Sequence, residues 1–387
     1  MSHRPTRRQS GFSLVEMVVA IAVGTVVLGA AVQVYVQGLG ATWTATQRAE
    51  LQQDFRAASN MLTTDLGLAG SGLGTGAAVP LPSTSAPRYG CAQTSGTPCY
   101  INGGSVAYPQ QGATYYLYGL LPGYDAGPTL LAAQGATDAV TVIYTDNNFY
   151  LNCYTAVISS TTTVTFTLPG TTSANCTSPT GNTGAQAVND SAVGLTAGDL
   201  VLFTFGTSNV VAEVTTAATA AGVATFATGD ALNMNQASAV ANSLASKYVA
   251  SPPAASPTSG YATRILTVTY YLDNTASTPR LMRQVSGHTP LPVAENVVYM
   301  KFTYNLFNDS TNTPVVGCTN PGAASDGCSG ASTGLLPNQI TQTNVQNMAM
   351  DSTINSSQFG SNNGYQRLDL QTSVSARNLS FVNNYPN

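Results

Sequence analysis

One carboxylate interrupts the most apolar run of the chain. Glu16 stands at the start of this run, and no residue from Met17 to Val32 is charged. The run is long enough to cross a bilayer as a helix, where an ionised carboxylate costs about 2.5–3.5 kcal/mol and therefore usually has a partner. The chemistry that Glu16 offers is ion pairing. The alternative interpretation is a plain signal anchor, which would not explain why a carboxylate stands at this position.

The residues ahead of the run are basic. Arg4, Arg7 and Arg8 precede it without any acid, which predicts that the N-terminus stays in the cytoplasm and that the rest of the chain is exported. An ordinary signal peptide is cleaved after its apolar run, at small residues. Here the distinctive junction, between Gly11 and Phe12, comes before the run.

Segment 10–16, SGFSLVE, resembles the class III signal of type IV prepilins and pseudopilins. The resemblance implies that prepilin peptidase cuts after Gly11 and methylates the new N-terminal residue, Phe12. It also implies that the apolar helix is kept, first as an inner-membrane anchor and then in the packing core of a filament with other major and minor pilins. In this family, the glutamate at the position of Glu16 pairs with the N-terminal amine of a neighbouring subunit.

Six cysteines form the second group of residues with defined chemistry. All lie beyond the apolar run, on the side expected to be exported, where disulfides persist. We predict pairing of nearest neighbours, because each pair falls within one loop-like stretch, although six cysteines allow other connectivities. The pairs are Cys91 with Cys99, Cys153 with Cys176, and Cys318 with Cys328. Zinc is the rival interpretation, but the sequence has no Cys-x-x-Cys and only one histidine beyond the leader.

The sequence shows no pattern of catalytic residues. His288 is predicted to lie on a surface loop, and there is no Gly-x-Ser-x-Gly elbow, phosphate-binding loop or metal-binding histidine pair. Two Asn- and Asp-rich stretches, 146–148 and 308–312, contain oxygen ligands for calcium. Neither has the spacing of a calcium loop, and such residues are ordinary in turns after strands. We therefore expect no enzyme activity, metal or cofactor.

Composition indicates a secreted, β-rich protein with long surface loops. Hydrophobic residues make up 43% of the 387 residues, which is too many for a disordered chain, and charged residues only 8%. The formal charge is −4, and it becomes −7 without residues 1–11, which hold three arginines and no acid. No specific nucleic-acid binding is predicted, because the chain lacks an overall basic footprint.

The element that must position Glu16 is a long helix. An apolar stripe recurs at three- and four-residue steps beyond the membrane segment and predicts that the helix continues to about residue 68, with one face against a sheet. The stripe consists of Leu51, Phe55, Ala58, Leu62 and Leu66. The charged residues of this segment, Asp65 among them, are expected mostly elsewhere around the helix. Glycines at 24, 29, 38 and 40 either allow a bend or, at 24 and 29, permit close helix contact.

The remainder is predicted to be an antiparallel β-rich domain, so the fold class is α+β, with a long N-terminal helix packed on the sheet. Tyrosines on the strands are expected to be half-buried, with a sugar- or partner-binding face as the alternative. Segment 339–350 is either a short amphipathic helix or a poor strand. The predicted strands are 115–118, 138–144, 153–159, 162–168, 199–205, 209–215, 223–227, 262–272, 280–285, 295–307 and 365–375.

Four strand motifs occur in an order similar to that of PilW-type minor pilins, a further resemblance within the same family. They are DAVTV at 138–142, GDLVL at 198–202, LMR at 281–283 and ENVVYMK at 295–301. Three insertions match no pattern: 77–112, 170–195 and 228–260, the last expected to be exposed with one short helix. The expected division is a leader at 1–11, a transmembrane and filament-core helix at 12–33, an amphipathic helix at 34–69 and the globular domain at 70–387.

The resemblance implies a minor pilin, a structural subunit that acts in pilus assembly and tip formation and, further, in adhesion or motility. The alternatives are a J-type pseudopilin of a type II secretion system and a pilus-tip adhesin. The expected location is a single pass in the inner membrane and then the pilus at the cell surface, with the globular domain periplasmic or extracellular.

Overall fold

The structure is a computed structural model. It describes residues 11–73, 78–89, 106–170, 173, 175–250, 259–322, 327–328, 334–352, 365–376 and 378–379.

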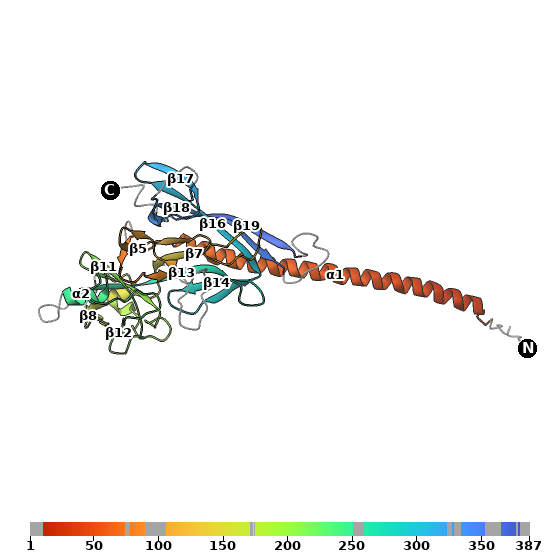
Figure 1. The fold of residues 1–387 in the computed structure, drawn as a ribbon. Coiled ribbons are helices and arrows are strands. Elements are labelled where there is room, and N and C mark those ends of the chain that lie inside the picture. The colour runs from red at the N-terminus through yellow and green to blue at the C-terminus, as the bar shows by residue number, and fades with distance from the viewer. Residues whose placement is uncertain are drawn as a thin grey trace, which may run out of the picture.

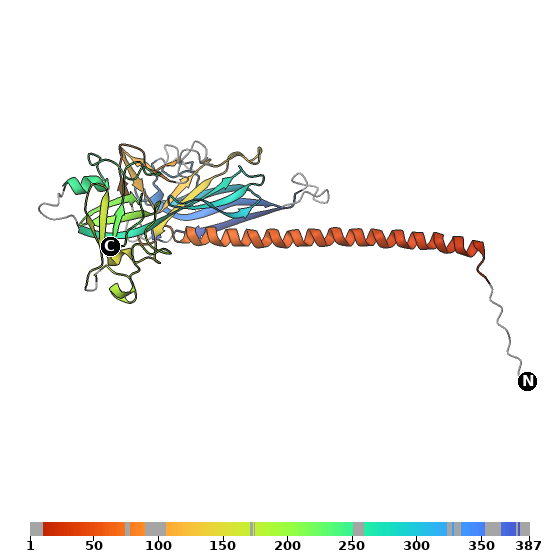
Figure 2. The ribbon, with the colours of Figure 1, turned by 90° about the horizontal axis from the view of Figure 1, so that it is seen from below.

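Helix α1 (Leu14–Gly67) is continuous over 54 residues, which corresponds to about 80 Å. Its first half projects away from the rest of the molecule, and its last turns lie against the sheets (Figures 1 and 2). The helix ends in a glycine-rich turn where Gly72 has a φ of 75°, and a Cβ there would lie 1.9 Å from the Thr145 hydroxyl oxygen. The predicted long helix is confirmed.

The larger sheet has ten strands, and β13 is its central strand. Antiparallel partners lie on both sides of β13: β8 and β7 pair with successive parts of one edge, and β10 and β14 with successive parts of the other. The strands are β6 (Leu120–Gly123), β7 (Ala139–Thr145), β8 (Thr155–Ile158), β9 (Thr163–Thr167), β10 (Leu200–Phe205), β11 (Ser208–Glu213), β12 (Val223–Thr225), β13 (Ser259–Asp273), β14 (Arg280–Val285) and β15 (Leu291–Glu295).

The second sheet has four antiparallel strands in the order β17-β16-β18-β19. Their bounds are β16 (Val297–Asn308), β17 (Thr313–Cys318), β18 (Ile340–Asp351) and β19 (Arg367–Ser375). Segment 339–350, left open between helix and strand, is therefore a strand. The strand predicted at 295–307 is confirmed from Val297 onward, as β16, but Glu295 belongs to β15, because Asn296 between them has a φ of 59°. Asparagine tolerates this left-handed backbone conformation. Asn296 therefore separates β15 of the first sheet from β16 of the second.

Smaller elements complete the globular part, here called the head. A three-stranded sheet has the order β1-β5-β4, and β2 pairs with β3. The bounds are β1 (Val79–Leu81), β2 (Arg88–Tyr89), β3 (Val106–Ala107), β4 (Gln110–Gln111), β5 (Thr114–Leu117) and α2 (Leu244–Ala250), with 3-10 turns at Leu151–Cys153, Gly181–Gly184 and Pro337–Gln339.

The main core lies between α1 and the two sheets. All five residues of the predicted helical stripe are buried, from Phe55 at 8% exposure to Leu62 at 0%. They share one apolar cluster with Val140 of β7, Val268 of β13 and Phe302 of β16. Burial of each large side chain contributes about 1.5–3 kcal/mol, so this stripe holds the helix to the head.

Two expectations about burial are wrong. Tyr118, Tyr270, Tyr271 and Tyr304 are at most 1% exposed rather than half-buried. Tyr270 and Tyr271 are successive residues of β13 and point to opposite faces of the sheet, so both faces of this strand are covered. The insertion at 228–260 is not simply exposed, because Leu232, Met234 and Leu244 are buried. Asp230 stabilises a turn in this segment, because its carboxylate accepts hydrogen bonds from the backbone N–H groups of Met234 (2.7 Å) and Asn235 (2.9 Å).

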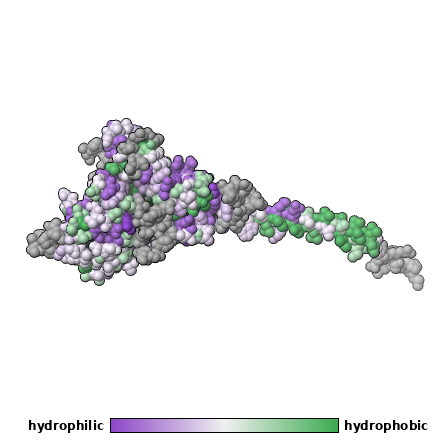
Figure 3. Space-filling model, viewed as in Figure 1, coloured by the Kyte–Doolittle hydropathy of each residue, from purple (hydrophilic) through white to green (hydrophobic). Residues whose placement is uncertain are grey.

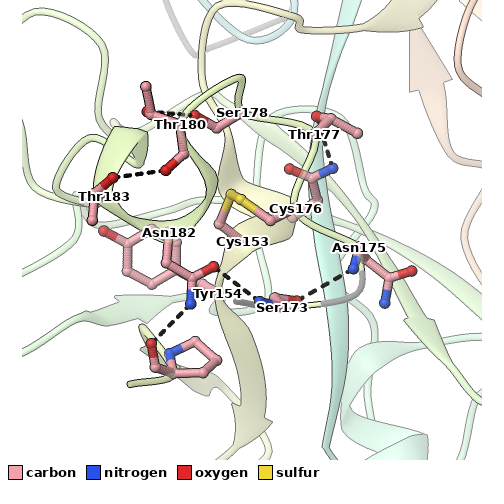
Figure 4. Close-up of a disulfide and its surroundings, with 12 residues drawn as sticks. Cys153, Tyr154, Ser173, Asn175, Cys176, Thr177, Ser178, Thr180, Asn182 and Thr183 are labelled. Atoms are coloured by element: carbon pink, nitrogen blue, oxygen red, sulfur yellow. Dashed lines mark hydrogen bonds between the residues drawn. A yellow bond between two sulfur atoms is a disulfide. The ribbon is translucent and has the colours of Figure 1, made fainter. Parts of the chain in front are cut away.

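Two disulfides connect loops of the head. Cys153 is bonded to Cys176 and Cys318 to Cys328, whereas Cys91 and Cys99 lie outside the described residues. Beside the first bond, Asn182 accepts a hydrogen bond from the Ser173 N–H (3.0 Å) and donates one to the Pro169 carbonyl (2.9 Å) (Figure 4). The covalent bond and these contacts together hold Cys176 and Ser173 beside Cys153 and Asn182.

Candidate processing and assembly site

The helix begins with a reciprocal cap formed by Ser13 and Glu16. The Ser13 hydroxyl oxygen accepts a hydrogen bond from the Glu16 N–H, and the Glu16 carboxylate accepts one from the Ser13 N–H, both at 3.2 Å. This capping box satisfies two backbone donors that the first turn leaves without helical partners. In a single chain, Glu16 therefore binds the start of its own helix.

The surface around this acid is apolar and exposed. Phe12 is 89% exposed, and it lines one shallow depression with Glu16, Val19 and Val23. Farther along α1, hydrophobic side chains remain exposed as far as Trp43, which is 62% exposed. The space-filling view shows this hydrophobic surface along the projecting helix, in contrast to the mixed surface of the head (Figure 3). Such a continuous apolar surface indicates contact with lipid or protein.

One helix of the described residues, α1, is long and apolar enough to cross a membrane, and none of its most apolar window is buried. The projecting part of α1 therefore has the properties of a membrane segment. The same apolar side chains would be available to other helices once they leave lipid.

The glycines of this region have no role in the fold of the single chain. A Cβ added at Gly11 would meet no heavy atom within 4 Å, and the same is true at Gly24, Gly29 and Gly38. Gly11 precedes the helix in an exposed position. Close packing among the described residues therefore does not require glycine at these positions, so the two explanations given above, a bend and close contact with another helix, both stay open.

Residues 6–32 match the family described as the prokaryotic N-terminal methylation motif. No curated protein and no solved structure matches the chain. The matched segment contains Gly11, Phe12 and Glu16, and it supports a type IV pilin-like protein, either a pilin or a pseudopilin. The long apolar helix followed by an antiparallel β-rich head is consistent with a pilin-like α+β fold. The motif indicates a structural subunit rather than an enzyme.

A second charged site lies where α1 enters the head. Asp65 accepts hydrogen bonds from the hydroxyl groups of Tyr144 (2.9 Å) and Tyr270 (2.6 Å) and forms an ion pair with Arg283, whose Nε lies 2.9 Å from Oδ2. Burial and the Asp65 carboxylate raise the pKa of both tyrosines. Burial opposes the charge of Arg283, but Asp65 outweighs it and raises the pKa of the guanidinium. The four groups connect α1 to β7, β13 and β14.

The sequence interpretation placed Asp65 off the buried stripe, and the structure corrects this: the residue is 5% exposed. A signal was present in the spacing, because Asp65 follows Leu62 by three residues and Ala58 by seven, and therefore lies on their face. Its partners were not visible in the same way, because 79 residues separate it from Tyr144 and 218 from Arg283.

His288 was predicted to lie on a surface loop and is partly exposed, but it is not isolated. Its Nε2 lies 2.9 Å from Asp199, which also accepts a hydrogen bond from the Thr196 N–H. Burial opposes the ionisation of Asp199, but the hydrogen bonds from His288 and Thr196 outweigh it and lower the pKa of the carboxyl. This arrangement holds the loop of His288 against the turn before β10.

Side chains of both Asn- and Asp-rich stretches contact other groups of the protein. Asp146 forms an ion pair with Arg264, and Asn308 accepts hydrogen bonds from the backbone of Ser310 and Thr311, as in an ordinary Asx turn. No group of three metal-binding side chains occurs among the described residues.

Proposed function

We propose that this chain is a minor pilin of a type IV pilus, processed by prepilin peptidase between Gly11 and Phe12. The observation that carries this proposal is the methylation motif, which the match places at 6–32. Two structural facts support it: the chain itself does not need glycine at position 11, and the helix after the junction exposes its apolar side chains. The large disulfide-bonded head would shape the pilus tip.

The proposal assigns a separate role to each part of the chain. Residues 1–11 are the leader, 12–33 the membrane and filament-core helix, 34–69 the amphipathic part of the helix, and 70–387 the head. The protein would span the inner membrane once before assembly and then belong to a fibre at the cell surface. Its partners would be prepilin peptidase and other major and minor pilins.

The assembly step would exchange the partner of Glu16. In the single chain, its carboxylate accepts a hydrogen bond from the Ser13 N–H. In the filament, the methylated amine of a neighbouring Phe12 would neutralise the carboxylate, and this pairing would select the register of the subunits. The helix moves from lipid into a bundle of similar helices, so packing and charge pairing drive the step more than new hydrophobic burial.

Mass spectrometry of the exported protein tests the processing. We expect a mature chain that begins at N-methylated Phe12. Assembled protein that keeps residues 1–11, or that begins beyond the apolar run, would contradict the proposal.

A substitution at Glu16 tests the charge pair. We expect Glu16→Ala to be cleaved and methylated normally but to enter fibres poorly, as measured by the ratio of this protein in sheared fibres to that in membranes. Glu50→Ala is a matched control, because Glu50 is an exposed acid on the same helix but lies beyond the apolar run. Normal incorporation of the Glu16 variant would exclude the charge-pair mechanism.

The matched motif supports a second candidate as well as it supports the minor pilin: a J-type pseudopilin of a type II secretion system. The reason is that pilins and pseudopilins share the same N-terminal processing signal. Deletion of the gene separates the two. Loss of surface fibres with intact protein secretion supports the pilin, and retained fibres with blocked secretion supports the pseudopilin.

A role as a tip adhesin rests on one concave site in the head. A pocket of about 340 Å³ is lined by polar side chains of two loops, including Ser85, Asn233 and Gln236. The second loop lies between β12 and α2, which are at the end of the head far from the start of α1 (Figure 1). Deletion of 228–260 would then abolish attachment with fibres intact, although the buried Leu232 and Met234 require a check of head folding.

A further inference from the structure

Lysine is rare in this chain, and one of its two lysines lies between two carboxylates. Lys247 belongs to the short helix α2, whereas Lys301 belongs to β16. The Nζ atom of Lys301 lies 2.7 Å from Oδ1 of Asp138 and also contacts the carboxylate of Asp125. The side chains of Lys301 and Asp138 are only 14% and 3% exposed, whereas that of Asp125 is 45% exposed.

The carboxyl group of Asp138 is held on both oxygens. Oδ2 accepts a hydrogen bond from the Phe302 N–H, and Oδ1 accepts one from the Asp125 N–H, each at 2.9 Å. These contacts fix the carboxyl carbon next to the Lys301 nitrogen. The ring of Tyr124 lies 4.6 Å from the same nitrogen and covers it from another side.

The pKa shifts of the two groups act in opposite directions: that of Asp138 favours the neutral pair, and that of Lys301 opposes it. Burial raises the pKa of Asp138 despite the hydrogen bonds that it accepts. Burial opposes the charge of Lys301, but the two carboxylates outweigh it and raise the pKa of the amine. The resting state is therefore an ion pair, and the raised pKa of Asp138 reduces the cost of moving one proton from Nζ to its carboxylate.

We propose that Lys301 and Asp138 condense into an intramolecular isopeptide bond. After proton transfer, the neutral Nζ attacks Cγ of Asp138, and the Phe302 N–H stabilises the negative charge that develops on Oδ2. The Cγ–Oδ1 bond then breaks, and Oδ1 leaves as water with two of the three ammonium protons, while the third stays on the amide nitrogen. Asp125 relays protons from nitrogen to Oδ1 and returns to its carboxylate form. Nothing is oxidised or reduced.

The fixed geometry is what makes this reaction accessible without an external reagent. Well-oriented intramolecular groups react as if at an effective concentration of about 10⁵–10⁸ M. The reaction has to occur only once in the life of each molecule, so a slow rate is sufficient.

The bond would join the two sheets of the head. Asp138 directly precedes β7 of the ten-stranded sheet, and Lys301 lies in β16 of the four-stranded sheet. The Asp138 N–H already donates a hydrogen bond to the Met300 carbonyl across this boundary (2.9 Å). A covalent link there resists separation of the sheets under load. This inference does not depend on the proposed function.

Mass spectrometry of the full mature chain, purified in detergent and reduced, tests the proposal. We expect a mass lower than that of the sequence by one water molecule. Trypsin should cleave after Lys247 but not after Lys301, and it should release a branched peptide that joins the segments containing Asp138 and Lys301. A full sequence mass with complete cleavage after Lys301 would overturn the proposal.

Three variants separate the condensation from a plain ion pair. Lys301→Arg keeps the positive charge but cannot condense, so this variant should have the full mass of its sequence. Lys247→Arg is the matched control, and its mass should still be lower than that of its sequence by one water molecule. Asp125→Asn keeps both bonding groups and should give a mixture in which the uncondensed form dominates shortly after synthesis. Full condensation of this variant at the wild-type rate would remove Asp125 from the mechanism. If Lys301→Arg does not fold, the wild-type mass and peptide map still decide the question.

Discussion

The two halves of α1 each contain an acidic residue, but the two residues differ in burial and in hydrogen-bond partners. In the projecting half, Glu16 is exposed on an apolar surface, and among the described residues its carboxylate accepts a hydrogen bond from the start of its own helix. In the half that lies on the head, Asp65 is buried and has two tyrosines and an arginine as partners. The difference shows that Asp65 finds its partners on other elements of the chain, whereas Glu16 binds within the first turn of its own helix.

The largest effect is expected at Asp65. Removal of one partner from a buried ion pair costs about 3–5 kcal/mol, so Asp65→Ala should lower the free energy of unfolding of the head by this amount. Asp54→Ala, at an exposed position of the same helix, should change it little. Denaturant titration of both mature proteins in detergent measures the difference. Equal stability of the two variants would mean that the ion pair does not hold the helix to the head.

Apolar side chains in the two halves of α1 should also differ in how much they contribute to the stability of the single chain. Leu62 is fully buried, and Leu62→Ala should cost about 2–5 kcal/mol of unfolding free energy. Ile21 is 60% exposed, so Ile21→Ala should leave the stability of the isolated chain unchanged and reduce only its insertion or assembly. Unfolding curves and fibre content, measured on both variants, separate these outcomes.

A third acid, Glu213, is buried next to another carboxylate and accepts a hydrogen bond from the Leu232 N–H (3.0 Å). Burial, together with the neighbouring Asp230, raises the pKa of Glu213 from 4.5 to about 8. Between these values the folded chain holds a proton that the unfolded chain has released, so stability should fall as pH rises, by at most about 1.4 kcal/mol per pH unit. Glu213→Gln should flatten this slope. An unchanged slope in the variant would assign the pH dependence to other groups.

The smallest effect is expected from the helix cap. Ser13→Ala removes one half of the capping box and should cost about 0.5–2 kcal/mol, confined to the first turn of α1. Hydrogen exchange of the first turn should increase while the head is unaffected. Fibre incorporation should remain far higher than in Glu16→Ala, because the carboxylate stays available to a neighbour. If both variants assemble equally poorly, the cap rather than the intersubunit pair is the feature that matters.

The parts of the molecule that were predicted correctly depend on residues close together in the sequence. The motif at 10–16 and the apolar stripe from Leu51 to Leu66 are local patterns, and the helix that they predicted is present. The same holds for most strands, such as β7 and β10, whose β-branched and aromatic runs are contiguous.

The parts that were missed depend on contacts between distant segments. The break at Asn296 follows from the need to pass from one sheet to the other, which no local pattern records. The burial of Tyr270 and Tyr271 requires cover on both faces of β13, and the pairing of Lys301 with Asp138 joins residues 163 positions apart. A sequence pattern identifies which residue types are available but not which of them meet.

The head buries no side chain of α1 before Leu51, and this division has a consequence for how such a protein can diversify. Before Leu51, the head contacts the helix through a polar side chain, because Arg48 donates a hydrogen bond to Gln366 (3.0 Å). The surface available to lipid and to other helices can therefore stay constant while the head acquires new loops, disulfides and pockets. The same projecting part of α1 is therefore compatible with many different heads.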